Sequence, residues 1–430
     1  MMQSFDIVIA GSGAASLYCA THLNPELKIL ILTKAGIRQC NSYLAQGGIT
    51  TVLDEEDKAD FIEDTMLAGK NENDRPAVEL LAEKAMEVLD DLVSFGVPFS
   101  RKNNQLCYTK EGAHRKNRIA YAKDQTGKYV METLIDVIQR KSNVTIWENM
   151  PLIDILEDEN HQCAGVIVDR GGQTETLYCQ RVILATGGIG GLFKNSTNDP
   201  TVTGDGLAIA SEHGVGLRNI GYIQFHPTTL YDPCGNGKRF LISESVRGEG
   251  AYLLNQKKER FVDELLPRDE VCKAILREQQ KTPKTPYVFL DISHEDETFI
   301  KERFPFIYQT CLEHGYDMTK EAIPVTPAEH YHMGGIAIDL NGRTSMKHLY
   351  AIGEAACSGV HGRNRLASNS LLEAVVFAKA CAQDINENLR GQTLSHHSVF
   401  KQADKQTKSG IVANLIIQEN GEVKDELFYR

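Results

Sequence analysis

The sequence predicts an α/β fold in which a doubly wound parallel sheet is interrupted by a second, inserted domain. Phe5–Ala10 is apolar except for Asp6 and ends in the turn Gly11-x-Gly13. Arg181–Ala185 and Leu349–Ile352 repeat the pattern of a buried strand followed closely by glycine. Unbroken apolar strands are typical of parallel sheets that are covered on both faces. Three such strand ends, far apart in the sequence, indicate one sheet assembled around one extended cofactor.

The first strand leads into a turn of the dinucleotide-binding type. The stretch after Gly13 is rich in Ala and Leu and predicts a helix, and Lys28–Thr33 predicts the next strand. Backbone N–H groups at such a turn and helix start favour a pyrophosphate. Ser16 replaces the third glycine of the usual pattern, and Lys34 stands where an acidic residue is expected. The motif alone is weak, so a tight turn that binds nothing remains an alternative.

Composition divides the chain into two domains. The main domain is discontinuous and comprises residues 1–220 and 332–395, and residues 221–331 form the insert. The insert has more proline, charged helical stretches such as Asp269–Gln280, and an isolated strand at Tyr287–Asp291. This change in composition and in the pattern of predicted elements indicates an α+β unit with a core of its own.

The last part of the chain is expected to complete the main domain. Ser368–Ala382 predicts a helix that includes Glu373. After Leu389 the chain becomes polar, apart from the apolar run Ile411–Ile417. Residues 396–430 are too few for a separate domain, so we expect either one helix packed on the main body or a partly disordered tail.

Composition also excludes several classes of protein. The 430 residues contain 46 Lys and Arg against 58 Asp and Glu, a net charge of -12, without the basic cluster that nucleic-acid binding needs. No apolar run approaches the length of a spanning helix, and Met1–Phe5 leads directly into the first strand. The ten cysteines are scattered without a C-x-x-C pair, so no metal site is expected. We therefore expect a cytoplasmic protein that binds neither nucleic acid nor membrane.

Eight short motifs are spread from about Phe5 to Asn388. They are Gly11–Ala15, Ala45–Gly48, Ala185–Gly188, Gln224–Thr228, Arg247–Gly250, Pro267–Asp269, His330–Gly335 and Asn364–Glu373. Together they resemble the flavoprotein family of succinate dehydrogenases, fumarate reductases and L-aspartate oxidases, and the L-aspartate oxidases most closely. The resemblance implies a doubly wound, FAD-binding Rossmann-like domain with residues 221–331 as an α+β capping domain. It also implies that the helical domain usual at the C-terminus of this family is largely absent from residues 396–430.

By this resemblance the cofactor is FAD. Asn41 stands where family members with covalent flavin carry a histidine, so the FAD is expected to be non-covalent. Glu354 is expected to bind the ribityl hydroxyls, and Lys34 is expected beside the adenosine half. The full set of residues expected around FAD is Ser12, Gly13, Ala14, Ala15, Lys34, Asn41, Ser42, Ala45, Gln46, Gly47, Gly48, Asp205, Glu354, Ser370 and Leu371.

The resemblance further implies oxidation of L-aspartate to iminoaspartate, the first step of de novo NAD biosynthesis. Reduced flavin would be reoxidised by oxygen or fumarate, and the imine would pass to quinolinate synthase. His226, His330 and Arg365 match the family's ligands for the substrate carboxylates, and an arginine fork suits a carboxylate because it binds bidentately. Arg268 matches the residue that exchanges the proton, and Arg247 is expected to add positive potential.

Glu111 is the residue expected to distinguish aspartate from succinate, because a carboxylate can pair with the α-ammonium of aspartate. Two alternatives remain open. A soluble fumarate reductase or succinate dehydrogenase-type flavoprotein would share the carboxylate ligands, although Glu111 and Asn41 speak against it. A non-catalytic FAD-binding module would not need the converging Arg and His set. The other histidines that we considered are expected to be ordinary structural or surface residues, namely His114, His361, His396 and His397.

Overall fold

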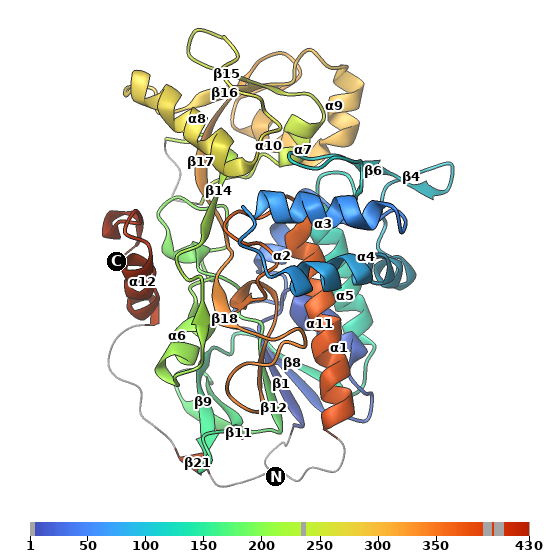
Figure 1. Ribbon diagram of the computed structural model, residues 1–430, viewed down its shortest axis with the longest axis vertical. Helices are drawn as coiled ribbons and strands as arrows, with labels where there is room; N and C mark the ends of the chain where they lie inside the picture. Colours follow the sequence, from blue (N-terminus) through green and yellow to red (C-terminus); the bar gives the residue numbers. More distant parts are fainter. Residues whose placement is uncertain (1–4, 234–237, 390–397, 400–407, 430) are drawn as a thin grey trace.

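The structure is a computed structural model that describes residues 5–233, 238–389, 398–399 and 408–429. Figure 1 shows two parts stacked along the long axis, a main domain below and a smaller capping unit above. His396 and His397 lie outside the described residues. Among the residues that are described, no helix is both long and apolar enough to cross a membrane.

A five-stranded parallel sheet forms the centre of the main domain. Its strand order is β19 (Leu349–Ala351), β12 (Arg181–Leu184), β1 (Ile7–Ala10), β2 (Ile29–Leu32) and β8 (Val144–Trp147). Every neighbouring pair is parallel. The chain adds strands on one side of β1 and later on the other, which is the winding of a doubly wound sheet. The predicted α/β class is therefore confirmed.

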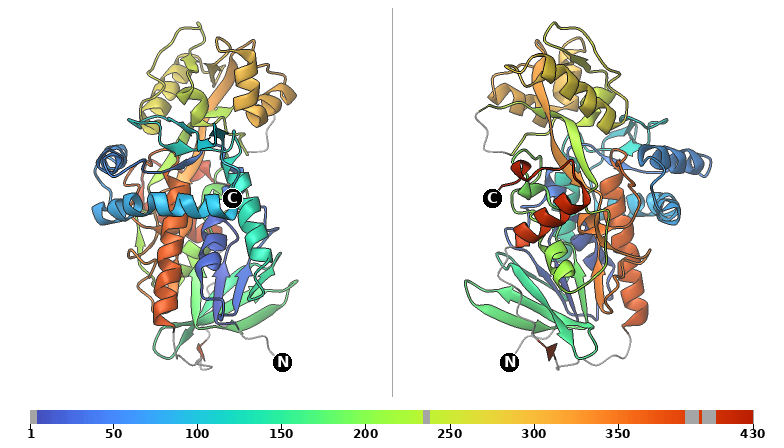
Figure 2. Two further views of the ribbon diagram at one scale, coloured as in Figure 1. Left: turned by 90° about the vertical axis from the view of Figure 1, so that its right-hand side faces the viewer. Right: turned by 60° about the vertical axis from the view of Figure 1, so that its left-hand side comes forward.

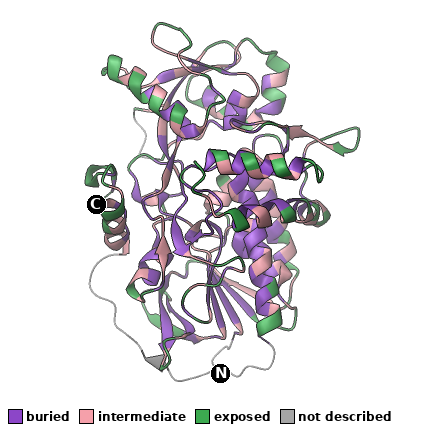
Figure 3. Ribbon diagram, in the orientation of Figure 1, coloured by how far each residue is buried: buried purple, intermediate pink, exposed green. Residues whose placement is uncertain are grey.

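The sheet is covered on both faces, by helices on one side and by a second sheet on the other. The helical layer contains α1 (Ala14–His22), α4 (Arg75–Phe95), α5 (Thr126–Gln139) and α11 (Asn369–Asn388), and the opposite layer contains β9 (Leu152–Asp158), β10 (Cys163–Asp169) and β11 (Thr174–Tyr178). Ile7 and Ile9 enter the helical core, whereas Val8 and Ala10 enter the other. β1, β2, β12 and β19 are buried along their whole length, whereas the edge strand β8 is half-buried, as the purple and pink ribbons of Figure 3 indicate. Burial on both faces explains why the inner strands are apolar throughout.

The capping unit is built on an antiparallel sheet. Its strand order is β14 (Ile223–Leu230), β17 (Ile323–His332), β16 (Val288–Asp291) and β15 (Tyr252–Leu254), and its helices are α7 (Glu244–Gly248), α8 (Arg268–Lys281), α9 (Glu297–Arg303) and α10 (Pro305–Glu313). A separate apolar core includes Leu230, Val271, Phe304 and Val325. β14 and β17 pair with each other and connect this unit to the main domain (Figure 1), so residues on them lie between the two parts.

The C-terminal helix α12 (Lys408–Glu419) packs on the main domain. It lies beside α6 (Asp205–Glu212), as Figures 1 and 2 show. Val412 and Ile416 are fully buried in an apolar cluster with Ile189 and Leu207. Of the two expectations for the tail, the packed helix agrees with the part of it that is described.

Candidate active site

A cavity of about 570 Å³ runs along the carboxyl ends of the central strands and under the capping unit. It passes the place where β1 and β12 lie side by side, which is the switch point of the strand order. Gly11, directly after β1, has a φ of +116°, and a Cβ there would lie 2.0 Å from the carbonyl oxygen of Ala185. Only glycine fits this close approach, so the first motif shapes the floor of the cavity.

The turn after β1 presents backbone N–H groups to the cavity. Gly13 is the N-cap of α1 and has no side chain with which to cap the helix. The Ala14 N–H donates to Ser42 Oγ at 3.0 Å, which joins the turn to α2 (Asn41–Leu44). A helix start that faces a cavity favours an anionic group such as a pyrophosphate, because the positive end of the helix dipole points toward it.

One end of the cavity is closed by an ion pair. Lys34 Nζ lies 2.8 Å from Asp205 Oδ2 and donates to the Thr203 hydroxyl at the same distance. Lys34 therefore stands after β2 as the partner of a carboxylate at the start of α6. This arrangement explains how a basic residue can occupy a position where dinucleotide-binding folds usually carry an acid.

The other end of the cavity is narrow and polar. A Cβ on Gly48 would lie 2.4 Å from the carbonyl oxygen of Ala120, and one on Gly188 would lie 2.4 Å from Glu354 Oε1. Glu354, in the short helix η2 (Gly353–Ala355), accepts the His332 N–H at 3.0 Å, and burial raises the pKa of its carboxyl to about 7. A half-buried carboxyl that faces the cavity is suited to accept hydroxyl groups of a ligand. These features fit the long shape and the ribityl hydroxyls of FAD.

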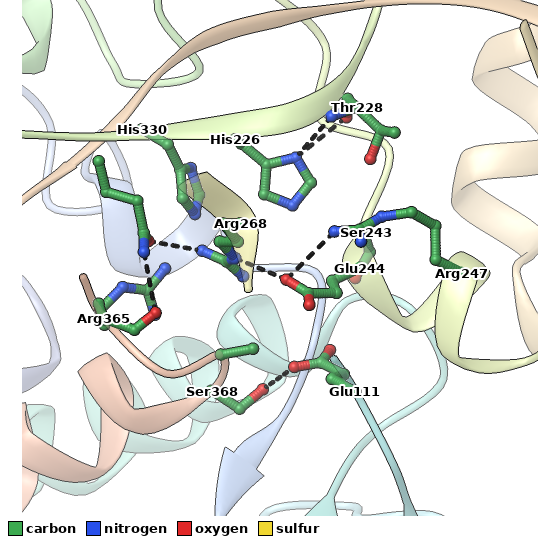
Figure 4. Close-up of polar contacts among 12 residues, drawn as sticks. Glu111, His226, Thr228, Ser243, Glu244, Arg247, Arg268, His330, Arg365 and Ser368 are labelled. Carbon is green, nitrogen blue, oxygen red and sulfur yellow. Dashed lines mark hydrogen bonds and ion pairs between the residues drawn. The ribbon is translucent and has the colours of Figure 1, made fainter. Parts of the chain in front are cut away.

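Five polar residues that the sequence singled out meet beyond this narrow end (Figure 4). His226 comes from β14, His330 from β17, Arg268 from the first turn of α8, Arg365 from the segment before α11, and Glu111 from the segment after β6 (Tyr108–Thr109). The rings of His226 and His330 have centroids 5.0 Å apart. All five line the cavity, and so does every residue that was expected around FAD.

Arg268 and Arg365 are held by one glutamine. Arg268 Nη1 donates to Gln224 Oε1 at 2.9 Å, and Gln224 Nε2 donates to the carbonyl oxygen of Arg365 at 2.8 Å. Arg268 Nε also donates to Glu244 Oε2 at 2.5 Å. Arg365 lies over the ring of Tyr331 at 4.6 Å. Both guanidinium groups are therefore oriented before any substrate arrives.

Both histidines are neutral. Burial first, and then the charge of Arg268, lower the pKa of His226 and of His330 well below the usual range. His226 Nδ1 lies 3.2 Å from the backbone nitrogen and 3.2 Å from the carbonyl oxygen of Thr228, so this edge of the ring is held by the chain and Nε2 faces the site. His226 Nε2 and Arg365 Nε are buried without a partner among the described residues. Unpartnered donors beside cationic groups are what a bound carboxylate requires.

Glu111 lies on the side of the pocket opposite the two histidines (Figure 4). Its Oε2 accepts the Ser368 hydroxyl at 2.6 Å, and only 2% of the residue is exposed. Burial, and then the nearby charge of Glu244, raise the pKa of its carboxyl. The site thus has a cationic wall and an anionic wall, which suits a ligand that carries both carboxylates and an ammonium group.

Sequence reasoning missed Glu244 and Gln224. Glu244 lies three residues before Arg247, which is fully buried, contacts Glu244 Oε2 at 3.3 Å and donates to the carbonyl oxygen of Glu264. Although burial opposes it, Arg247 and Arg268 lower the pKa of Glu244. Arg247 is not among the residues that line the cavity, but its positive charge lowers the pKa of Glu244 and contributes to lowering the pKa of His226. Gln224 is the first residue of the motif Gln224–Thr228, and Glu244 lies just before the motif Arg247–Gly250. Their position in or beside these motifs could have identified them as site residues.

Comparison with known proteins gives one consistent answer. Residues 6–371 match the FAD binding domain family. An L-aspartate oxidase from Clostridium perfringens is 47% identical over 430 residues, which cover 99% of this chain and 98% of that protein. Another, from Clostridium acetobutylicum, is 49% identical over 385 residues and covers 89% of this chain and 88% of its own. A quinol fumarate reductase chain of E. coli has a TM-score of 0.84 at 30% identity and covers 97% of this chain and 74% of its own.

These matches agree with the cavity described above. The family match extends from the first strand into α11 and so includes the segments that line the FAD-shaped part of the cavity. The cofactor is therefore FAD, as the resemblance in the sequence implied. With relatives of this identity over nearly its full length, the chain belongs to the L-aspartate oxidases, within the larger family of FAD-binding flavoproteins that includes the fumarate reductases.

Proposed function

We propose that this chain oxidises L-aspartate to iminoaspartate, with oxygen or fumarate as the final electron acceptor. Relatives named L-aspartate oxidase, matched over nearly the whole chain, support this reaction. The observation that carries the proposal is the buried Glu111 carboxylate opposite the wall of His226, His330 and Arg365. Succinate and fumarate have no cation to offer Glu111, whereas the ammonium group of L-aspartate does.

The chain's own residues bind and orient the substrate. Arg365 and the two histidines bind its carboxylates, and Glu111 holds the nitrogen. FAD, when bound, supplies the hydride acceptor for the substrate carbon. Fixing both ends of a small dicarboxylate leaves its Cα–H bond little freedom, and such orientation accounts for a large part of catalysis in many enzymes. The capping unit provides His226, His330 and Arg268 and so excludes water from the reacting atoms.

Arg268 is the residue to which we assign proton exchange with the substrate, on the basis of the family resemblance. An arginine has a high pKa and does not easily lose its proton. The 2.5 Å contact between Arg268 Nε and Glu244 Oε2 supports the assignment, because a carboxylate is available to take part in the transfer. Gln224 fixes the other edge of the guanidinium and keeps that geometry.

The product is an unstable imine, so a second enzyme must consume it quickly. We propose that quinolinate synthase does so, and that the reaction is the first step of de novo NAD biosynthesis. This role would locate the protein in the cytoplasm. Asn41, in place of the histidine of covalent flavoproteins, supports non-covalent FAD, which denaturation of the protein should release intact.

The direct test is anaerobic flavin reduction. Purified holoenzyme is mixed with L-aspartate or with succinate in separate cuvettes, and the flavin absorbance is followed. Bleaching by L-aspartate but not by succinate is the expected result. Bleaching by succinate alone would contradict the proposal and favour a succinate dehydrogenase-type flavoprotein. Bleaching by neither compound in a flavin-loaded sample would favour a module without catalysis.

A further inference from the structure

Glu329 directly precedes His330 on β17 and has no described role in the reaction. The residue is fully buried, and it does not line the cavity that His330 lines. Its side chain instead meets the segment Asn195–Asp199, which leads from η1 (Gly190–Leu192) along the cavity toward α6. Glu329 therefore lies between a substrate-binding histidine and a segment whose residues Thr197 and Asn198 line the cofactor cavity.

Backbone and side chain of Glu329 both hold this segment. The Glu329 N–H donates to the carbonyl oxygen of Asn195 at 3.0 Å, and the Thr197 N–H donates to the carbonyl oxygen of Glu329 at 2.9 Å. Glu329 Oε2 accepts the Ser196 hydroxyl at 2.5 Å and Asn198 Nδ2 at 2.8 Å. These four hydrogen bonds, one to each of the four consecutive residues from Asn195 to Asn198, fix the position of the segment relative to β17.

The same segment contacts the two ends of the active site. The Thr197 hydroxyl lies 2.7 Å from His330 Nδ1, and Asn198 Nδ2 donates to the His330 carbonyl oxygen at 3.2 Å. The Asn198 side chain also accepts a hydrogen bond from the Asn41 side chain, and the Asp199 N–H donates to Asn41 Oδ1 at 2.8 Å. A shift of the segment would therefore move both the substrate-binding imidazole and the asparagine expected beside the flavin ring.

No cation neutralises Glu329 among the described residues. Its Oε1 is buried without a partner, and the charged group that acts on it is another acid, Glu354. The cations on the adjoining capping segment are directed elsewhere, since Lys238 faces Asp199 at 3.9 Å and the Arg239 guanidinium donates to Asn195 Oδ1. Burial raises the pKa of Glu329 to about 8, so its carboxyl is mostly protonated at neutral pH.

We propose that Glu329, as a neutral carboxylic acid, is a positioning residue that fixes Ser196–Asn198 and, through this segment, both His330 and Asn41. The inference rests on the proposed function, because it assigns His330 to the substrate carboxylate. It predicts that an uncharged side chain able to accept the same two hydrogen bonds preserves the site, and that a side chain without an acceptor does not.

The test compares Glu329→Gln with Glu329→Ala in the holoenzyme. Glu329→Gln should keep the KM for L-aspartate and the Kd for FAD within about twofold of wild type, whereas Glu329→Ala should raise the KM about tenfold, since small displacements of a positioned group have effects of this size. Ser196→Ala removes the hydroxyl that donates to Glu329 Oε2 and should also raise the KM for L-aspartate. Because the two residues share a bond, the double variant should lose less than the sum of the single effects.

Glu157→Ala is the matched control. Glu157 is also a buried carboxylate, but it lies on β9, where it pairs with His213. This variant should lower the melting temperature and leave the KM unchanged, which separates positioning from general destabilisation. Equal impairment of Glu329→Gln and Glu329→Ala would overturn the proposal, as would a wild-type KM in Ser196→Ala. If wild type is not reduced by L-aspartate, the proposed function fails, and the FAD Kd of the same variants still decides the role of Glu329.

Discussion

At the scale of single residues, Glu111 determines which dicarboxylate the pocket accepts. We expect Glu111→Gln to raise the KM for L-aspartate about 30-fold, or about 2 kcal/mol, because the substrate ammonium loses its buried partner. Succinate should bind more tightly to this variant, since a repulsive charge is removed. Steady-state kinetics with succinate as a competitive inhibitor measures both effects. Glu63→Gln is the control, because Glu63 is exposed on α3 (Asp57–Ala68) and pairs only at the surface with Arg115.

Arg365 tests whether the cationic wall needs a fork or only a charge. Arg365→Lys keeps the charge but loses the planar group that lies over Tyr331, and with it the Nε–H that has no partner among the described residues. We expect the KM for L-aspartate to rise about 100-fold, or about 2.7 kcal/mol, because a lysine ammonium cannot replace the bidentate fork that an arginine offers to a carboxylate. Arg363→Lys is the control in the same segment, because the Arg363 side chain is 66% exposed. An unchanged KM in Arg365→Lys would show that its geometry does not matter.

At the scale of elements, α12 packs against the chain between η1 and the start of α6, on the side away from the cofactor cavity that this segment lines. A Cβ on Gly204 would lie 3.1 Å from the Val412 side chain, and Gly204 directly precedes Asp205 of the ion pair with Lys34. The backbone beyond α12 also pairs with Leu192 and Lys194. The helix and the residues after it therefore stabilise the chain from η1 to the start of α6 on the side away from the cavity.

This contact predicts that α12 contributes to FAD retention. Val412→Asp places an unpaired charge in an apolar cluster, so we expect a lower melting temperature and about tenfold weaker FAD binding, which corresponds to about 1.4 kcal/mol. Flavin fluorescence during titration of the apoprotein gives the Kd. Asn414→Asp, on the exposed side of the same helix, should leave both values unchanged. Equal Kd values in the two variants would mean that α12 does not act on the cofactor site.

At the scale of the whole molecule, sequence patterns predicted the features that depend on neighbouring residues in the chain, such as buried strands and glycine turns. Apolar strands followed by glycine identified β1, β12 and β19, because a strand that is buried on both faces needs apolar residues at successive positions. The strand predicted at Tyr287–Asp291 is β16 (Val288–Asp291). The motifs likewise selected residues that line one cavity, with the exception of Arg247. The contacts of Glu329 were not predictable, since they join β17 to residues more than 130 positions earlier in the chain.

Buried ionisable groups of opposite type make the stability of the apoprotein depend on pH in two directions. Burial lowers the pKa of His114 and of His332 to about 4. Between about pH 6.5 and pH 4 these histidines are protonated only in the unfolded chain, so the folded state loses stability as the pH falls through this range. His226 and His330 act in the same direction, because their pKa values are also lowered. The acidic side of the stability profile is therefore set by histidines.

Acids with a raised pKa set the alkaline side, among them Glu354 and Glu329. Burial raises the pKa of Glu354 to about 7 and of Glu329 to about 8, so the folded state retains protons that the unfolded chain releases near pH 4.5, and stability is lost as the pH rises to about 8. With more histidines than acids titrating below pH 6.5, we expect the melting temperature of the FAD-free protein to be highest near that pH. Scanning calorimetry between pH 5 and pH 9 measures the profile. Glu329→Gln should flatten the decline between pH 6.5 and pH 8 and steepen the rise between pH 5 and pH 6.5, because Glu329 opposes stability over this whole interval. A decline of unchanged slope would mean that Glu329 is already ionised in the folded protein.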